Sequence, residues 1–184
     1  RDVQLAQLEL SDYKSAFENA DLVIEAIFEN LAVKQDLIRK IESIASVNTI
    51  IASNTSYIDL DEIAEVSLRP ENIVGIHFFN PAHIMRLVEV IHGNNTSQEV
   101  IATAFALVQK LGKLPIICKN SFGFIGNRIY AAYRYQCELM LEEGALPHEI
   151  DQAIESFGFN MGPFAVGDLS GLDIAWNMRK ANAS

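Results

Sequence analysis

The sequence predicts an α/β domain with a doubly wound sheet, followed by an all-helical domain. Short apolar runs of strand length alternate with segments of helical spacing as far as Cys118. This alternation is typical of a doubly wound, mainly parallel sheet. From Phe122 onward the apolar residues recur only at helical spacing. We therefore expect the boundary near Lys119–Ser121, with domains at residues 1–119 and 120–184.

Each strand expected in the first domain is a short apolar run, as in strands buried on both faces. Strands are expected at residues 21–27, 49–53, 73–78, 86–91 and 114–118. Helices are expected near residues 13–19 and at 31–45, 59–66 and 97–111, the last ended by Gly112. In the second domain, helices are expected at 122–142 and 147–157, and a third begins at 161–164.

Composition and charge exclude several classes of protein. The 184 residues carry a net charge of -10, which argues against a nucleic-acid partner. No apolar run reaches membrane-spanning length, so no membrane span is expected. Cys118 and Cys137 lie in apolar surroundings without a CxxC pair and are interpreted as buried, reduced thiols. The histidines form no ligand cluster, so no metal site is expected.

The stretch GIHFFNPAHIMRLVEVI, residues 75–91, places His77 at the end of one apolar run and Glu89 inside another. A charge within an apolar run is costly unless a partner neutralises it. If the two runs are neighbouring strands, His77 is the nearest candidate partner, and a carboxylate holding an imidazole is a general-base arrangement. The alternative is a histidine at a strand end and a carboxylate on a solvated face.

Polar residues follow three of the expected strands. Glu29 and Lys34 come after the first strand, the segment Ser53–Ser56 after the second, and Asn80 after the third. In an open α/β sheet, ligands bind beyond the carboxyl ends of the strands. Each group alone is also compatible with an ordinary turn, helix cap or ion pair. Three such strand ends together favour a binding cleft.

Two glycines, Gly123 and Gly126, fall early in the helix expected at 122–142. Glycine lowers helix propensity, so both positions need a packing reason. Asn127, next in the chain, could then point into the cleft.

A glycine-rich phosphate loop of the GxGxxG type is absent from the sequence. Doubly wound dinucleotide-binding domains commonly carry this loop after their first strand. Either the fold is a different α/β fold or the first strands of such a domain are missing.

Five segments carry a specific family pattern: DLVIEAIFENLAVKQDLI, ASNTS, GIHFFNPAHIMRLVEVI, GKLPIICKNSFGFIGNRI and FGFNMGPFAVGDLSGLD. In this order they resemble the 3-hydroxyacyl-CoA dehydrogenase family. The details PAHIMRLVEV, LMLEEG and FGFNMGPF look most like the dehydrogenase part of multifunctional fatty-acid β-oxidation enzymes. The resemblance implies a Rossmann-type sheet that lacks its first strands and a helical domain that stops early, so the chain looks like a fragment truncated at both ends.

The resemblance also implies roles for individual residues. His77 matches the family's catalytic histidine and Glu89 its carboxylate partner. Ser56 and Asn127 match polar residues that contact the substrate and belong to the predicted catalytic set. The positions that contact NAD are matched by Glu29, Lys34, Ser56 and Asn80.

The implied reaction is the NAD-dependent oxidation of a (3S)-3-hydroxyacyl-CoA to a 3-ketoacyl-CoA, with weak or no activity expected of the fragment alone. A homodimer or fusion to an enoyl-CoA hydratase domain is possible on this resemblance. The expected compartment is the cytoplasm in a bacterium, and the peroxisome or mitochondrion in a eukaryote. Two alternatives are another NAD(P)-dependent hydroxyacid dehydrogenase and a non-catalytic, crystallin-like structural remnant.

Overall fold

The computed structural model describes residues 9–171 and Trp176. The chain divides into two compact units between Ile125 and Gly126. Residues 172–175 and 177–184, which belong to the predicted helical domain, lie outside the described residues.

The first unit is built on a five-stranded sheet whose strand order is the order of the chain. The strands are β1 (Leu22–Glu25), β2 (Ile50–Ser53), β3 (Ile73–Phe78), β4 (Leu87–His92) and β5 (Leu114–Lys119). All five predicted strands are confirmed. Strands β1, β2 and β3 are parallel, β4 runs antiparallel to β3, and β5 is parallel to β4. The reversal at β4 follows from the short link between Phe78 and Leu87, because a parallel crossover needs a dozen or more residues.

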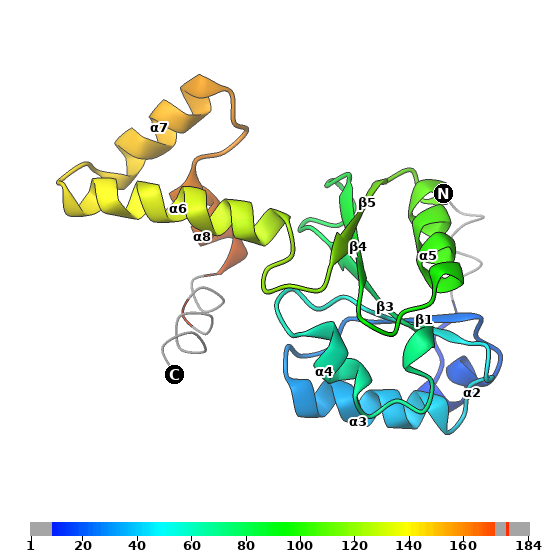
Figure 1. Cartoon of the computed structure of the whole chain (residues 1–184). Helices are drawn as coiled ribbons and strands as arrows, with labels where there is room; N and C mark the ends of the chain where they lie inside the picture. The colour runs from blue at the N-terminus through cyan, green and yellow to red at the C-terminus, as the bar shows by residue number, and fades with distance from the viewer. Residues whose placement is uncertain (1–8, 172–175, 177–184) are drawn as a thin grey trace. The chain divides into compact units, whose positions relative to one another are not determined.

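Helices cover both faces of this sheet, as Figure 1 shows. Helices α3 (Leu31–Glu42) and α4 (Leu60–Ala64) lie on one face, and α5 (Gln98–Lys110) lies on the other. The side chains of Asn30, Asp59 and Ser97 cap the three helices by accepting hydrogen bonds from first-turn amides. A short helix α2 (Tyr13–Glu18) precedes β1, and a 3-10 turn η1 (Pro70–Asn72) precedes β3.

Two apolar cores result from the alternation of side chains along the strands. One core joins the sheet to α3 and α4 through buried residues that include Ile38, Ile41, Ile51, Ile63, Ile73 and Ile91. The other joins the sheet to α5 through Ala52, Val74, Val88, Val90, Val100, Ala104 and Val108. Burial on both faces explains why β2 and β3 read as apolar runs in the sequence, whereas most residues of the apolar strand β5 are exposed.

Strands β3 and β4 approach closely at Gly75, which lies opposite Ile91. A Cβ atom added to Gly75 would lie 2.8 Å from the Cβ of Ile91. The absence of a side chain at Gly75 therefore permits this register, and the same register brings His77 opposite Glu89.

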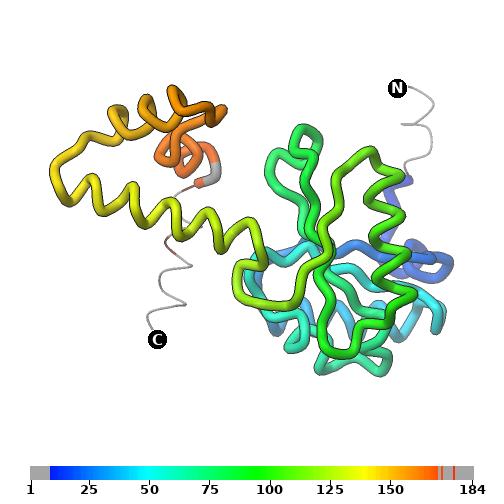
Figure 2. Tube along the Cα trace, turned by 45° about the horizontal axis from the view of Figure 1, so that its top comes forward, coloured from blue at the N-terminus to red at the C-terminus, as the bar shows by residue number. Residues whose placement is uncertain are grey.

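The second unit contains α6 (Gly126–Glu142), α7 (Pro147–Phe157) and α8 (Pro163–Ser170). Figure 2 shows α6 in yellow and α7 in orange, joined by a short connection. The predicted helix start at Phe122 was wrong, because Gly123 and Phe124 have positive φ angles of 69° and 46° and interrupt the helical backbone. Gly123 therefore serves a turn before α6 and Gly126 opens the helix.

Asp151 of α7 fixes the start of α8. Its two carboxylate oxygens accept hydrogen bonds from the backbone amides of Phe164 and Ala165, at 2.9 and 3.0 Å. A carboxylate at a helix N-terminus satisfies amides that have no partner within the helix. The MGPF segment is thereby tied to α7.

The two cysteines, Cys118 and Cys137, are buried free thiols, as predicted. Among the residues that the structure describes, no cluster of histidine, cysteine and carboxylate groups could hold a metal ion. Within the same residues, no helix is both long and apolar enough to cross a membrane.

Candidate active site

His77 and Glu89 form a buried pair across β3 and β4. The two residues are register partners, and the Nδ1 atom of His77 lies 2.7 Å from Oε2 of Glu89. Glu89 is fully buried and His77 is 5% exposed. The structure thus has the pairing that the sequence predicted from a carboxylate within an apolar run, and a solvated face for Glu89 is excluded.

The second oxygen of Glu89 is held by the turn before α6. The backbone amide of Ile125 donates to Oε1 of Glu89 at 2.9 Å. The ring of Phe124, 1% exposed, lies 5.8 Å from the imidazole of His77, and Phe79 lies 4.7 Å from it on ring centroids. Sequence reasoning missed Phe124 and Ile125, because nothing in their residue types shows that the turn folds over the carboxylate.

This geometry fixes the orientation of the imidazole. Because a carboxylate can only accept, Nδ1 of His77 carries the hydrogen, which leaves Nε2 as the nitrogen that can exchange a proton with a ligand. The negative charge of Glu89 also affects its neighbour Cys118. Burial and then this charge raise the pKa of the Cys118 thiol to about 12, so Cys118 remains a neutral thiol.

The loop after β2 is attached to the end of β3 by Asn54. The side-chain oxygen of Asn54 accepts from the backbone amide of Phe78 at 2.9 Å, and the backbone amide of Asn54 donates to the carbonyl of Glu25. Since Phe78 follows His77, Asn54 links the carboxyl ends of β1, β2 and β3. The polar segment 53–56 is therefore more than a turn.

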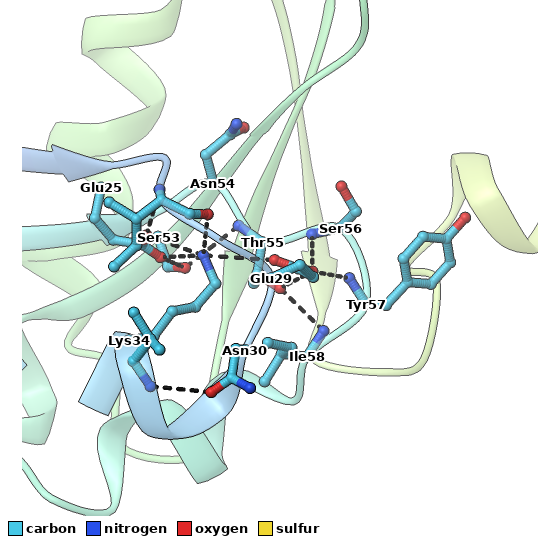
Figure 3. Close-up of polar contacts among 12 residues, drawn as sticks. Glu25, Glu29, Asn30, Lys34, Ser53, Asn54, Thr55, Ser56, Tyr57 and Ile58 are labelled. Carbon is cyan, nitrogen blue, oxygen red and sulfur yellow. Dashed lines mark hydrogen bonds and ion pairs between the residues drawn. The ribbon is translucent and has the colours of Figure 1, made fainter. Parts of the chain in front are cut away.

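Glu29 and Ser56, predicted separately as cofactor-binding residues, lie together (Figure 3). One oxygen of Glu29, Oε1, accepts from the Thr55 hydroxyl at 2.6 Å, from the Ser56 amide at 2.8 Å and from the Tyr57 amide at 3.0 Å. Burial raises the pKa of Glu29, but the hydrogen bonds from Thr55, Ser56 and Tyr57, together with the charge of Lys34, lower it overall. Glu29 is thus a stable anion that joins the loops after β1 and β2.

Lys34 lies inside a network of carboxylates rather than on the surface. Its side chain is 1% exposed, and its Nζ atom lies 2.9 Å from both oxygens of Glu25 and 3.4 Å from Oε2 of Glu29. An ion pair, which was one of the alternatives for this strand end, is present between Lys34 and Glu29, but the nearer partner of Lys34 is Glu25. Sequence reasoning missed Glu25, although this residue also places a charge within an apolar run, Leu22–Ile27.

Asn80 and Asn127 are the two remaining predicted site residues. Asn80 is exposed, two residues after β3, and forms a cis peptide bond with Pro81. Asn127 lies in the first turn of α6, in the second unit. Contacts of Asn80 with NAD and of Asn127 with substrate remain predictions.

Fold and site together define a class. A mainly parallel sheet with helices on both faces presents polar loops at the carboxyl ends of its strands, where α/β domains bind nucleotides. A buried histidine–carboxylate pair lies at the next strand end. The first unit is thus a Rossmann-type domain of the kind found in nucleotide-dependent dehydrogenases.

Comparison with protein families identifies the branch of this class. Residues 1–121 match the family model for the 3-hydroxyacyl-CoA dehydrogenase NAD binding domain, and residues 123–184 match the model for the C-terminal domain of the same enzymes. The chain belongs to the 3-hydroxyacyl-CoA dehydrogenase family. The predicted family and its cofactor, NAD, are thereby confirmed.

Individual relatives agree with this assignment. The peroxisomal bifunctional enzyme of Danio rerio is 46% identical over 173 residues, which cover 94% of this chain and 24% of that enzyme. The (S)-3-hydroxybutyryl-CoA dehydrogenase PaaH1 of Ralstonia eutropha superimposes with a TM-score of 0.86 at 41% identity, covering 92% of this chain and 60% of that one. The dehydrogenase part of multifunctional enzyme 1 from C. elegans gives a TM-score of 0.64 at 38% identity, covering all of this chain and 44% of that one. The chain therefore spans about a quarter of the bifunctional relative.

Proposed function

We propose that the protein containing this sequence oxidises (3S)-3-hydroxyacyl-CoA thioesters to 3-ketoacyl-CoA thioesters with NAD. The observation that carries this proposal is the buried pair of His77 and Glu89, with Nδ1 of the imidazole bonded to the carboxylate. Oxidation of a secondary alcohol requires a base for the hydroxyl proton, and an oriented imidazole is suited to that role.

In this proposal, Nε2 of His77 takes the hydroxyl proton of the substrate. Glu89 holds the ring in place and stabilises the imidazolium that forms. The amide of Ile125 keeps the Glu89 carboxylate aligned from the other side. Ser56 and Asn127 would hold the substrate's polar groups, so that the reacting carbon is presented in one orientation.

The residues at the strand ends fit a nicotinamide cofactor. Hydroxyl, amide and carboxylate groups, which bind ribose and carboxamide groups, gather where β1 and β2 end. We propose that Glu29, Ser56 and Asn80 hold NAD directly, and that Lys34, whose side chain is 1% exposed, serves the NAD site by neutralising Glu29. When bound, NAD would supply the hydride acceptor for this oxidation.

The setting we propose is fatty-acid β-oxidation. The Danio rerio relative is named a peroxisomal bifunctional enzyme, and the C. elegans structure is the dehydrogenase part of a multifunctional enzyme. By analogy, we propose that this sequence serves as the dehydrogenase part of such an enzyme, fused to an enoyl-CoA hydratase domain. In a eukaryote it would act in the peroxisome.

Replacement of His77 tests the proposed function. In the protein that contains this sequence, His77→Ala should lower the turnover of acetoacetyl-CoA with NADH by about 10²- to 10⁴-fold, the usual contribution of general acid–base catalysis. His92→Ala is the matched control, because His92 lies on the neighbouring strand β4 and its Nδ1 bonds to the carbonyl of Gly93 rather than to a carboxylate. Normal turnover by folded His77→Ala protein would refute the proposed role.

A further inference from the structure

Glu25 is a buried carboxylate for which the proposed reaction has no use. It ends β1, is 3% exposed, and accepts hydrogen bonds at both oxygens. Lys34 donates to both oxygens at 2.9 Å, the amide of Ile27 donates to Oε2 at 3.2 Å, and the hydroxyl of Ser53 donates to Oε1. A carboxylate this deeply buried is tolerated only when it is fully paired, and Glu25 meets that condition.

The ammonium of Lys34 is shared between two carboxylates. Figure 3 shows it lying between Glu25 and Glu29. Its distance to the nearest oxygen is 2.9 Å for Glu25 but 3.4 Å for Glu29. Glu25 is therefore the residue that fixes the position of the cation, and Glu29 is attracted to a cation that is already in place.

Glu29 in turn holds the loop after β2. While Oε2 faces Lys34, Oε1 accepts from the Thr55 hydroxyl and from the amides of Ser56 and Tyr57. An unbroken series of contacts thus runs from Glu25 through Lys34 and Glu29 to the backbone of Ser56. All of these residues belong to the first unit.

We propose that Glu25 is a positioning residue: by anchoring Lys34, it holds Glu29 against residues 55–57 and so sets the backbone position of Ser56. The role of Ser56 in ligand binding rests on the proposed function. The series of contacts from Glu25 to Ser56, by contrast, can be measured without cofactor or turnover. Glu25 would then affect the site without touching any ligand.

The substitution Glu25→Gln separates charge from shape. Glutamine has nearly the same volume and can still accept from Ser53, but it removes the negative charge that anchors Lys34. Glu29 then becomes the only carboxylate of this network that can neutralise Lys34. The cation is drawn toward Glu29, and the carboxylate of Glu29 is pulled away from the amides of Ser56 and Tyr57.

The test is amide hydrogen exchange of the ¹⁵N-labelled chain, followed by NMR. In Glu25→Gln, exchange at Ser56 and Tyr57 should be faster by about 10-fold, as expected when a hydrogen bond to a charged group is weakened. The amide of Ile76, in the central strand β3, reports any global loss of stability and serves as the internal reference. Asp36→Asn is the matched control, because Asp36 lies on α3 in an exposed pair with Arg39 and should leave both amides unchanged.

Unchanged exchange at Ser56 and Tyr57, or acceleration by the same factor as Ile76, would overturn the proposal. If Glu25→Gln does not fold, Glu25→Asp takes its place, because it keeps the charge but shortens its reach. It should accelerate the same two amides severalfold relative to Ile76, and no local change would again overturn the proposal. Since the measurement needs no turnover, its failure is distinguishable from a failure of the His77 test.

Discussion

Glu89 and Glu25 are two buried carboxylates of the sheet, and each is stabilised by a different kind of partner. Their exposed fractions are 0% and 3%; Glu89 lies inside β4 between apolar residues, and Glu25 is the last residue of the apolar strand β1. Glu89 is paired with an imidazole, whose second nitrogen can exchange a proton with a ligand, whereas Glu25 is paired with an ammonium, which can only donate hydrogen bonds. The first pair is suited to move a proton, and the second pair is suited to hold a loop.

The second oxygen of each carboxylate sharpens this difference. Glu89 uses Oε1 to accept from the amide of Ile125, so His77 interacts with one oxygen only. Both oxygens of Glu25 bind the ammonium of Lys34. Loss of a partner should therefore damage stability most at Glu25 and turnover most at Glu89.

The largest expected effect is the loss of stability in Lys34→Met. The substitution leaves Glu25 buried without its cation, and removing one partner of a buried ion pair costs about 3–5 kcal/mol. Urea unfolding of the variant measures this loss. Arg39→Met, on the same helix but in an exposed pair, should cost no more than about 1 kcal/mol. Equal stabilities of the two variants would show that the network around Lys34 does not stabilise the fold.

A smaller effect is expected for Glu89→Gln, and this effect is on turnover rather than on stability. The amide can serve either His77 or Ile125 as an acceptor, but it cannot stabilise an imidazolium by charge. Turnover of acetoacetyl-CoA should fall by about 10²-fold, or about 2.7 kcal/mol in the barrier. The unfolding midpoint should change far less than it does in Lys34→Met. Normal turnover in folded Glu89→Gln protein would contradict the assigned difference between the two carboxylates.

The smallest effect is the pH dependence that Glu29 contributes. Its pKa is lowered from 4.5 in the folded chain, so its contribution to stability is present above about pH 4.5 and is lost as the pH falls through the folded pKa. The effect is small because the side chain is 40% exposed. The stability difference between wild type and Glu29→Gln should shrink as the pH is lowered below about 4.5. A difference that grows in acid would reverse the sign of this contribution.

Much of the fold could be predicted because strands buried on both faces, such as β3, leave a strong signal in the sequence. The strands from Leu22 to Lys119 read as apolar runs, and Gly112 marks the end of α5 through its φ of 72°. The start of α6 could not be predicted, since the apolar spacing continues through residues 122–125 although Phe124 has a positive φ. The turn formed by Gly123 and Phe124 delays the helix, and the amide of Ile125 that follows this turn bonds to Glu89 instead of continuing a helix from Phe122.

One part of the site, the carboxylate Glu89, could be predicted from the sequence, whereas the network around Lys34 could not. A charge inside an apolar run correctly directed attention to Glu89, and the same signal was present at Glu25 but was not used. The sequence predicts Lys34 only as a polar residue after the first strand that could contact NAD or form an ion pair. Its burial depends on Glu25 and Glu29 approaching from two sides, which no local pattern contains.

The central claim is that Glu89 orients His77 so that Nε2 handles the proton. The ¹⁵N spectrum of the histidine rings tests it directly, with the signals of His77 identified by their loss in His77→Gln. For the neutral ring of His77, we predict a protonated Nδ1 and an unprotonated Nε2, and this tautomer should be lost or mixed in Glu89→Ala. A neutral His77 with the proton on Nε2 would contradict the account, because Nδ1 would then have no hydrogen to donate to Glu89.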